Sequence, residues 1–231
     1  MTTSPIDLTC NQSEKCQHCS IRQLVLFADL CPEDFDLLQL PIENIKLQTG
    51  DVLYEEKQAA KYVYTIRSGL LKQVRYLADG SYRVVRLLQQ GDLAGIEALA
   101  GSSYMHHTII LQDATVCQIP IEKIEQLNEN TSHLYKQLTA RWKKIQSDAD
   151  LWLTEFTVGS SKKRVAKLLI YLSTQNNHDS FYLPSRVDIG SLLAITTETA
   201  SRIIAEFKRQ GGVQTQRHYA KIDIAKLKQL Y

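Results

Sequence analysis

The sequence predicts an α+β fold, in which a rolled antiparallel β unit leads into one long helix and then into a C-terminal unit of short helices and paired strands. Three observations predict it. Short β-type runs alternate with glycine turns between residues 45 and 120. Apolar residues recur at steps of three and four between residues 135 and 156. Amphipathic helical segments followed by a Gly-Gly break and a final alternating run fill the last 70 or so residues.

Composition fits a globular protein with room for one large or two modest domains. The 231 residues are 44% hydrophobic and 23% charged. No apolar run approaches the roughly 18 residues that a membrane span needs. Residues 1–9 lack the basic head and apolar middle of a secretion signal. We therefore expect a cytoplasmic protein with no membrane partner.

The β unit is predicted from turn chemistry. Gly50, Gly69, Gly80 and Gly91 separate runs of β-branched, aromatic and aliphatic residues. Asp79-Gly80 is typical of a hairpin turn, because Asp-Gly supplies the positive φ that such turns require. Even strand spacing with turns of this kind favours a closed or rolled antiparallel sheet.

The long helix carries an apolar seam with three heptads of a/d spacing, which is typical of a helix that pairs with a parallel copy. Polar residues at 143, 144 and 146 flank the seam and favour an exposed helix and a homodimer. The alternative is a helix packed on its own β unit. The predicted seam consists of Tyr135, Leu138, Trp142, Ile145, Ala149, Trp152 and Phe156.

The C-terminal unit is basic, whereas the rest of the chain is acidic. Residues 161–231 hold 12 Lys and Arg against 5 Asp and Glu, and residues 1–160 hold 15 against 20. A basic domain of this kind favours a polyanionic partner, although a solvated basic face has the same composition. Residues 157–161 form the predicted linker between the two parts.

Residues 186–204 have the spacing of a helix-turn-helix, with Ile189 and Leu193 facing inward and Thr196 able to cap the second helix. The outer face of that helix would meet base edges in double-stranded DNA, and a strand pair from Val213 onward would form a wing with a basic tip. The predicted DNA contacts are Thr196, Thr197, Glu198, Ser201, Arg202, Arg217 and Lys221.

Four of the five cysteines lie in the first 31 residues. The number is odd and no export signal accompanies them, so a disulfide framework is not expected. Thiolate coordination of a metal is the better interpretation. The cysteines are Cys10, Cys16, Cys19, Cys31 and Cys117.

Four motifs together resemble the CRP/FNR family of dimeric bacterial transcription regulators, and most closely its oxygen-sensing FNR branch. They are Cys16-Gln17-His18-Cys19-Ser20, Gly91-Asp92-Leu93-Ala94-Gly95, Val116-Cys117-Gln118-Ile119-Pro120, and Asp188-Ile189-Gly190 followed by Glu198-Thr199-Ala200-Ser201-Arg202. The resemblance implies a cysteine-rich segment (1–30), a cyclic-nucleotide-binding-like β-roll sensor domain (31–130), a dimerisation helix (131–157) and a winged helix-turn-helix (161–231). It also implies a TTGAT-type palindrome as the DNA site and RNA polymerase as a partner.

The same resemblance implies a [4Fe-4S] cluster, which four soft thiolates would hold and whose loss to oxygen would change dimerisation. Cys16, Cys19 and Cys117 match three ligand positions of the family. The fourth position is Val25 here, so Cys10 is the expected substitute and Cys31, at a predicted helix start, is its rival. A zinc site, redox-active thiols or a vestigial tail are the alternatives.

Two further expectations follow from the resemblance. Asp148 matches an acidic residue near the dimer seam, where paired like charges would make the dimer marginal; a solvated acid is the alternative. Residues 104–108 lack the Arg that would clamp a cyclic-nucleotide phosphate, so no cyclic nucleotide is expected.

We therefore predict a transcription regulator and not an enzyme, since no Cys-His-acid constellation, phosphate-cradling loop or HExxH motif occurs. The competing prediction is a regulator of the same fold that is gated by haem, nitric oxide, thiol redox state or a partner protein.

Overall fold

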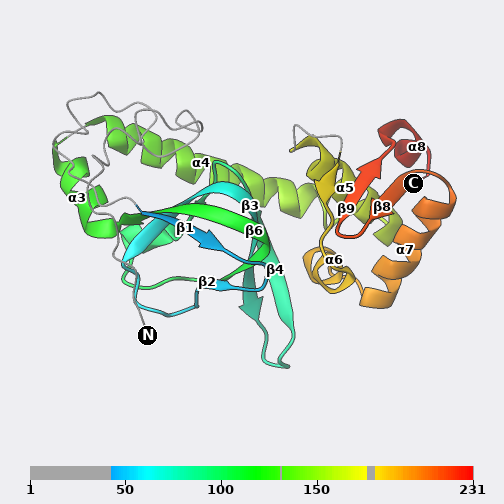
Figure 1. The fold of residues 1–231 in the computed structure, drawn as a ribbon, viewed down its shortest axis with the longest axis horizontal. Coiled ribbons are helices and arrows are strands. Elements are labelled where there is room, and N and C mark those ends of the chain that lie inside the picture. Colours follow the sequence, from blue (N-terminus) through cyan, green and yellow to red (C-terminus); the bar gives the residue numbers. More distant parts are fainter. Residues whose placement is uncertain (1–42, 131, 176–179, 231) are drawn as a thin grey trace, which may run out of the picture.

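The structure is a computed structural model that describes residues 43–130, 132–175 and 180–230 (Figure 1). The predicted helix start at Cys31 and the candidate ligands Cys10, Cys16 and Cys19 lie outside these residues. None of the described helices is long and apolar enough to cross a membrane.

The N-terminal part is an antiparallel β-roll. Its sheet has the strand order β1-β6-β3-β4, with β2 also paired to β6 and β5 to β3. The two longest strands, β3 and β6, pair along most of their length and form the centre of the roll. The strands are β1 (Glu43–Leu47), β2 (Val52–Tyr54), β3 (Tyr62–Tyr76), β4 (Tyr82–Leu88), β5 (Leu93–Ala94) and β6 (His107–Pro120).

Two positions in the roll require glycine for different reasons. Gly80 has a φ of 81° in the β3–β4 turn, where Leu77 N donates to Ser81 O over 2.8 Å. Gly69 lies within β3, and a Cβ added there would come within 2.6 Å of Ala114 on β6. The first glycine permits the hairpin, and the second permits two backbones to approach closely where the roll bends.

One long helix crosses the roll and leads to the C-terminal part (Figure 1). A 3-10 turn, η2 (Ile96–Ala100), and helix α3 (Ile121–Asn130) precede α4 (Ser132–Glu155). Side chains of α4 share a hydrophobic cluster with the sheet through Leu134, Leu138 and Ile145. The long helix therefore packs on its own β-roll along one side.

The C-terminal part is a helical unit with a small three-stranded sheet of order β7-β9-β8. Helix α5 begins after the linker, where Ser160 accepts from Lys163 N as an N-cap. The remaining bounds are α5 (Ser161–Thr174), β7 (Phe181–Tyr182), α6 (Arg186–Leu193), α7 (Thr197–Arg209), β8 (Val213–Gln216), β9 (Tyr219–Ile222) and α8 (Ile224–Gln229). The predicted α+β fold is confirmed.

Candidate nucleic-acid interface and sensor site

Helices α6 and α7 meet at a tight turn. Ala194 ends α6 with a φ of 54°, and its N–H donates to Gly190 O. A Cβ on Gly190 would lie 2.8 Å from the carbonyl oxygen of Ile195. Only glycine fits this approach without a shift, so Gly190 sets how closely the start of α7 lies against α6.

Helix α7 is held at its start and along its inner face. The Thr196 hydroxyl accepts from Thr199 N at 3.2 Å, as predicted for an N-cap. Ala200, Ile203 and Phe207 are buried in the core of the C-terminal unit. Because these residues anchor one side of the helix, the opposite side is fixed in orientation.

That opposite side carries the predicted DNA contacts. Glu198, Ser201 and Arg202 are exposed, and Thr196 before them is exposed as well. Thr197 is partly buried. Positions 198, 201 and 202 lie three or four residues apart and therefore share one face near the helix N-terminus. Arg at such a place can donate two hydrogen bonds to guanine, and Glu can accept one from a cytosine amino group.

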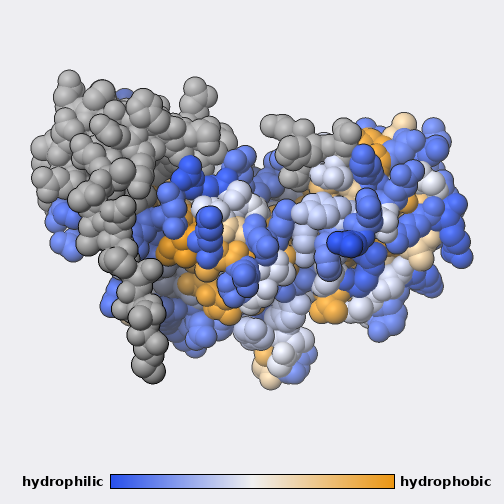
Figure 2. Space-filling view, viewed as in Figure 1, coloured by the Kyte–Doolittle hydropathy of each residue, from blue (hydrophilic) through white to orange (hydrophobic). Residues whose placement is uncertain are grey.

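The wing is the hairpin of β8 and β9. Its strands pair from Val213 and Ile222 to Gln216 and Tyr219, so residues 217 and 218 form the turn. Arg217 is exposed there with a φ of 51°, and Lys221 is exposed on β9. Residues 214–221 line an open concave surface. In Figure 2 this end of the molecule is mainly hydrophilic, which suits contact with phosphates.

Helix α4 splits the predicted seam into two groups. Leu138, Ile145 and Trp152 pack against clusters of the same chain. Phe156 is 3% exposed and is buried within the same chain, although we expected it at a dimer interface. Ala149 is exposed.

The exposed apolar stripe of α4 follows a different register. Tyr135 and Trp142 are 64% and 41% exposed, and Leu153 is 64% exposed. Tyr135, Trp142 and Ala149 are seven residues apart, as in the predicted seam. The second exposed position of each heptad is 139, 146 or 153, and not 138, 145 or 152. The predicted seam already contained Tyr135, Trp142 and Ala149. Sequence reasoning missed Leu153 and the positions 139 and 146, because the second position of each heptad was placed one residue too early. The exposed stripe is Tyr135, Thr139, Trp142, Gln146, Ala149 and Leu153.

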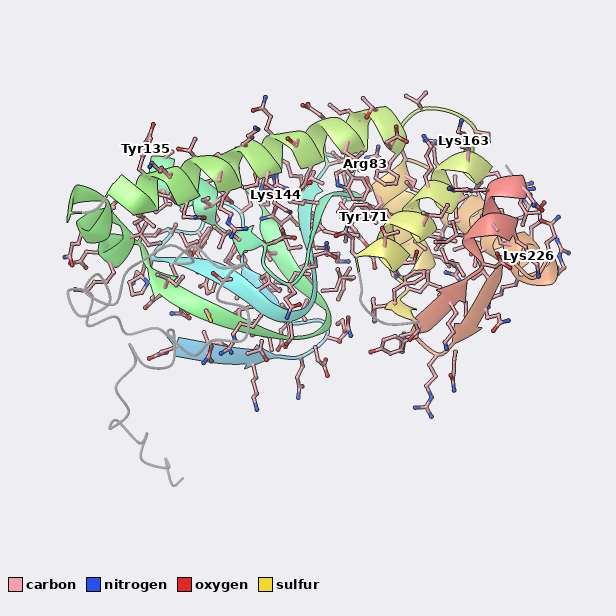
Figure 3. The ribbon with its side chains drawn as sticks, turned by 90° about the horizontal axis from the view of Figure 1, so that it is seen from above. Arg83, Tyr135, Lys144, Lys163, Tyr171 and Lys226 are labelled. Carbon is pink, nitrogen blue, oxygen red and sulfur yellow. The ribbon has the colours of Figure 1, made fainter. Side chains whose placement is uncertain are left out.

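Asp148 lies in a charged network between α4 and the turn before β5. Lys144 Nζ donates to Asp92 at 2.7 Å and to Asp148 at 3.0 Å. Burial opposes the charge on Lys144, but the carboxylate of Asp92 and then that of Asp148 outweigh it and raise the pKa of Lys144. Figure 3 shows Lys144 on the side of α4 that faces the roll and Tyr135 on the opposite side. Asp148 therefore has a cationic partner within its own chain.

Cys117 is the one candidate cluster ligand within the described residues. It lies on β6, paired with Asn44 on β1 and Thr65 on β3. Its Sγ is 3.2 Å from Asn44 Oδ1, which also accepts from Arg67 at 2.9 Å. Ile119, two residues along on the same strand face, belongs to the cluster that includes Leu138. The thiol is thus on the face of the sheet that supports α4.

Cys117 also lies where the N-terminal segment joins the roll. Glu43 is the first described residue, and its neighbour Asn44 is in contact with Cys117. Cys31 is 13 positions before Asn44 and Cys10 is 34 positions before it, so a chain of roughly 3.3 Å per residue reaches Cys117 from either. Among the described residues no group of three or more His, Cys, Asp or Glu could hold a metal. The position fits a cluster whose other ligands come from residues 1–42.

Aromatic rings occupy the inside of the roll. Tyr54 and Tyr104 stack with ring centroids 3.9 Å apart, and the Tyr104 hydroxyl donates to Tyr62 O at 2.8 Å. Burial raises the pKa of Tyr104. Nearby, burial acts against the charge of Glu97, but the imidazole of His106, 4.0 Å away, and the backbone N–H groups of Glu97 and Met105 together outweigh it and lower the pKa of the carboxyl group.

In comparisons with known proteins, each half of the chain matches a family model. The family model described as cyclic nucleotide-binding domain matches residues 44–131, and that described as Crp-like helix-turn-helix domain matches residues 163–230. The fumarate and nitrate reduction regulatory proteins of Salmonella typhimurium and Escherichia coli K12 are each 28% identical over 216 residues, which cover 90% of this chain and 86% of theirs.

Solved structures agree with these matches in fold. FixK2 from Bradyrhizobium japonicum superimposes with a TM-score of 0.74 at 22% identity, covering 82% of this chain and 96% of that one. A transcriptional regulator of the CRP family from Thermus thermophilus superimposes with a TM-score of 0.70 at 19% identity, covering 80% of this chain and 95% of that one. The arrangement of roll, long helix and C-terminal unit is therefore shared with these proteins.

Proposed function

We propose that this chain, which belongs to the CRP/FNR family of DNA-binding transcription regulators, senses oxygen or redox state through a cysteine-held [4Fe-4S] cluster. The observation that carries the proposal is the position of Cys117. It lies on the sheet face that supports α4 and beside the point where the cysteine-rich segment enters the roll. The relatives that span most of the chain are named as fumarate and nitrate reduction regulators, which supports the same interpretation.

Cys117, Cys16, Cys19 and Cys10 would hold the cluster, with Cys31 as the rival fourth ligand. When bound, the group would supply reactivity towards oxygen that protein side chains lack. The protein itself would couple the state of the cluster to the position of α4. Because Cys117 and Ile119 lie on one strand face and Ile119 packs in the α4 cluster, tethering Cys117 to residues 10–31 would bias the position of α4.

The exposed stripe on α4 suits a dimer that responds to such a bias. CRP/FNR regulators act as dimers, and the stripe would pair with the same stripe of a second copy. Thr139 and Gln146 interrupt its apolar residues, so the stripe buries less apolar area than a continuous seam would. A modest signal can shift a dimer of marginal stability.

The resemblance to the FNR branch implies that the DNA site would be a TTGAT-type palindrome. Glu198, Ser201 and Arg202 would read it, because these residues are exposed on one face near the start of α7. Arg217 and Lys221 of the wing would contact phosphates. The proposal includes contact with RNA polymerase and a cytoplasmic location, where bacterial DNA lies.

Cysteine substitution tests the cluster and identifies its fourth ligand. The variants Cys117→Ala, Cys10→Ala and Cys31→Ala, each purified under anaerobic conditions, would be assayed for iron, for acid-labile sulfide and for DNA affinity with and without air. We expect Cys117→Ala and Cys10→Ala to lose iron and sulfide and Cys31→Ala to retain them. Loss in Cys117→Ala and Cys31→Ala, with iron and sulfide retained in Cys10→Ala, would assign Cys31 as the fourth ligand. Iron-free wild type that binds DNA fully would support a regulator gated by another signal.

A further inference from the structure

The C-terminal unit (residues 161–230, here the reader domain) is docked on the β-roll. One hydrophobic cluster includes Val74 and Val84 of the roll together with Ile189 and Leu193 of α6. Helix α6 lies against β4, the strand at the edge of the sheet. The first helix of the helix-turn-helix is therefore the element that joins the reader domain to the roll.

Ser191 on α6 completes the open edge of β4. Its hydroxyl donates to the carbonyl of Tyr82 at 2.7 Å and accepts from the N–H of Val84 at 2.8 Å. An edge strand presents unpaired N–H and C=O groups, and here one serine satisfies one of each. Docking is thus specified by directional bonds as well as by apolar contact.

One turn before Ser191, Asp188 forms an ion pair that joins the two domains. Its Oδ1 accepts from Lys72 Nζ at 2.5 Å and from the Tyr82 hydroxyl at 2.9 Å. Its Oδ2 accepts from Ser185 Oγ at 2.7 Å. The side chains of Lys72 and Asp188 are only 11% and 6% exposed. Both charges are buried, and each depends on the other domain for its compensation.

We propose that Lys72, in the β-roll, is a positioning residue for DNA reading. It holds Asp188, and through α6 it fixes the orientation of α7 relative to α4. The docked arrangement leaves Glu198, Ser201 and Arg202 exposed, so docking does not cover the reading face. In a dimer the two reading helices must meet half-sites about 34 Å apart. A fixed reader domain presents them at one spacing, whereas a freely tethered one must first be ordered and therefore binds the palindrome more weakly.

This inference rests on DNA binding by a dimer and not on the cluster. Removing one member of a buried ion pair leaves an uncompensated charge, whereas removing both leaves neutral groups of similar shape. Lys72→Met and Asp188→Asn should therefore each release the reader domain, and the double variant should dock again. Lys72→Arg retains the charge and should keep the domain docked.

Two readouts test the proposal on full-length protein prepared in one cluster state. Hydrogen exchange at the Val84 amide reports docking, because its bond to Ser191 crosses the domain boundary. Fluorescence anisotropy with a palindrome and with a single half-site reports positioning. In each single variant the Val84 amide hydrogen should exchange at least about tenfold faster than in wild type. Affinity for the palindrome should fall at least about tenfold, whereas affinity for the single half-site should stay within about twofold of wild type. The double variant and Lys72→Arg should return both values to within about threefold of wild type.

Arg75→Met is the matched control. Arg75 lies on the same strand as Lys72, but its nearest acid, Glu56, is 3.9 Å away and its side chain is 58% exposed. It should change neither readout, as expected of an exposed ion pair. Single variants that keep Val84 protected would overturn the docking role of the ion pair. Variants that release Val84 yet bind the palindrome as well as wild type, or more tightly, would overturn the positioning role. Failure of the cluster proposal would appear separately, as wild-type protein without iron.

Discussion

Trp142 lies in the middle of the exposed stripe, and its replacement should weaken the dimer. It is 41% exposed in the single chain. Because a Trp side chain buries about 150–250 Å², each protomer has roughly 60–100 Å² of it left to cover. At about 25 cal/mol per Å², two copies contribute roughly 3–5 kcal/mol to the dimer. Trp142→Ala should therefore raise the dimer dissociation constant at least about 100-fold.

Sedimentation equilibrium of anaerobic protein measures that constant directly. Lys143→Ala, an exposed neighbour in the sequence, is the control that should change it by less than about threefold. Leu138→Ala should instead reduce the stability of the fold, because Leu138 packs in the cluster beneath α4. A dissociation constant for Trp142→Ala that stays within about threefold of wild type would refute the assignment of this stripe as the dimer surface.

Three further predictions concern the reader domain. Arg202→Ala should cost about 1–3 kcal/mol on the preferred half-site and flatten discrimination at one base pair, as measured by anisotropy with base-substituted DNA; uniform loss across all sequences would contradict a base contact. Arg217→Ala should weaken all DNA sequences alike and reduce the slope of log K against log salt by about one, whereas an unchanged slope would remove Arg217 from the phosphate contacts. Gly190→Ala should destabilise the reader domain by about 1–3 kcal/mol in urea, because its Cβ would lie 2.8 Å from Ile195 O; wild-type stability would show that the helices can separate without cost.

Local patterns predicted the reader domain well. The cap at Thr196, the small residue at Gly190 and the apolar spacing of α7 are all short-range features, and the structure places each as expected. Glycine turns likewise placed the β3–β4 hairpin. Such features could be predicted from the sequence because the physical cause and its effect lie within a few residues of each other.

The direction of α4 could not be predicted in the same way. The residues at 135, 142 and 149 face solvent, whereas those at 138, 145 and 152 pack against clusters of the same chain. Their spacing along the sequence does not say which of them face the roll and which face solvent. The predicted seam merged the two.

The ion pair between Lys72 and Asp188 gave no local signal at all. The two residues are 116 positions apart, and each is ordinary in its own segment. Only docking of the reader domain on β4 brings them together. Contacts that join two domains depend on the tertiary arrangement, and a single sequence does not specify it through any short pattern.

Iron and acid-labile sulfide analysis of anaerobically purified wild-type protein, with DNA affinity measured on the same sample before and after exposure to air, tests the central proposal most directly. We predict about four iron and four sulfide per chain, tight binding to the palindrome before exposure, and loss of both cluster and binding afterwards. Protein that contains no iron and binds the palindrome equally well in both conditions would contradict the proposed sensor.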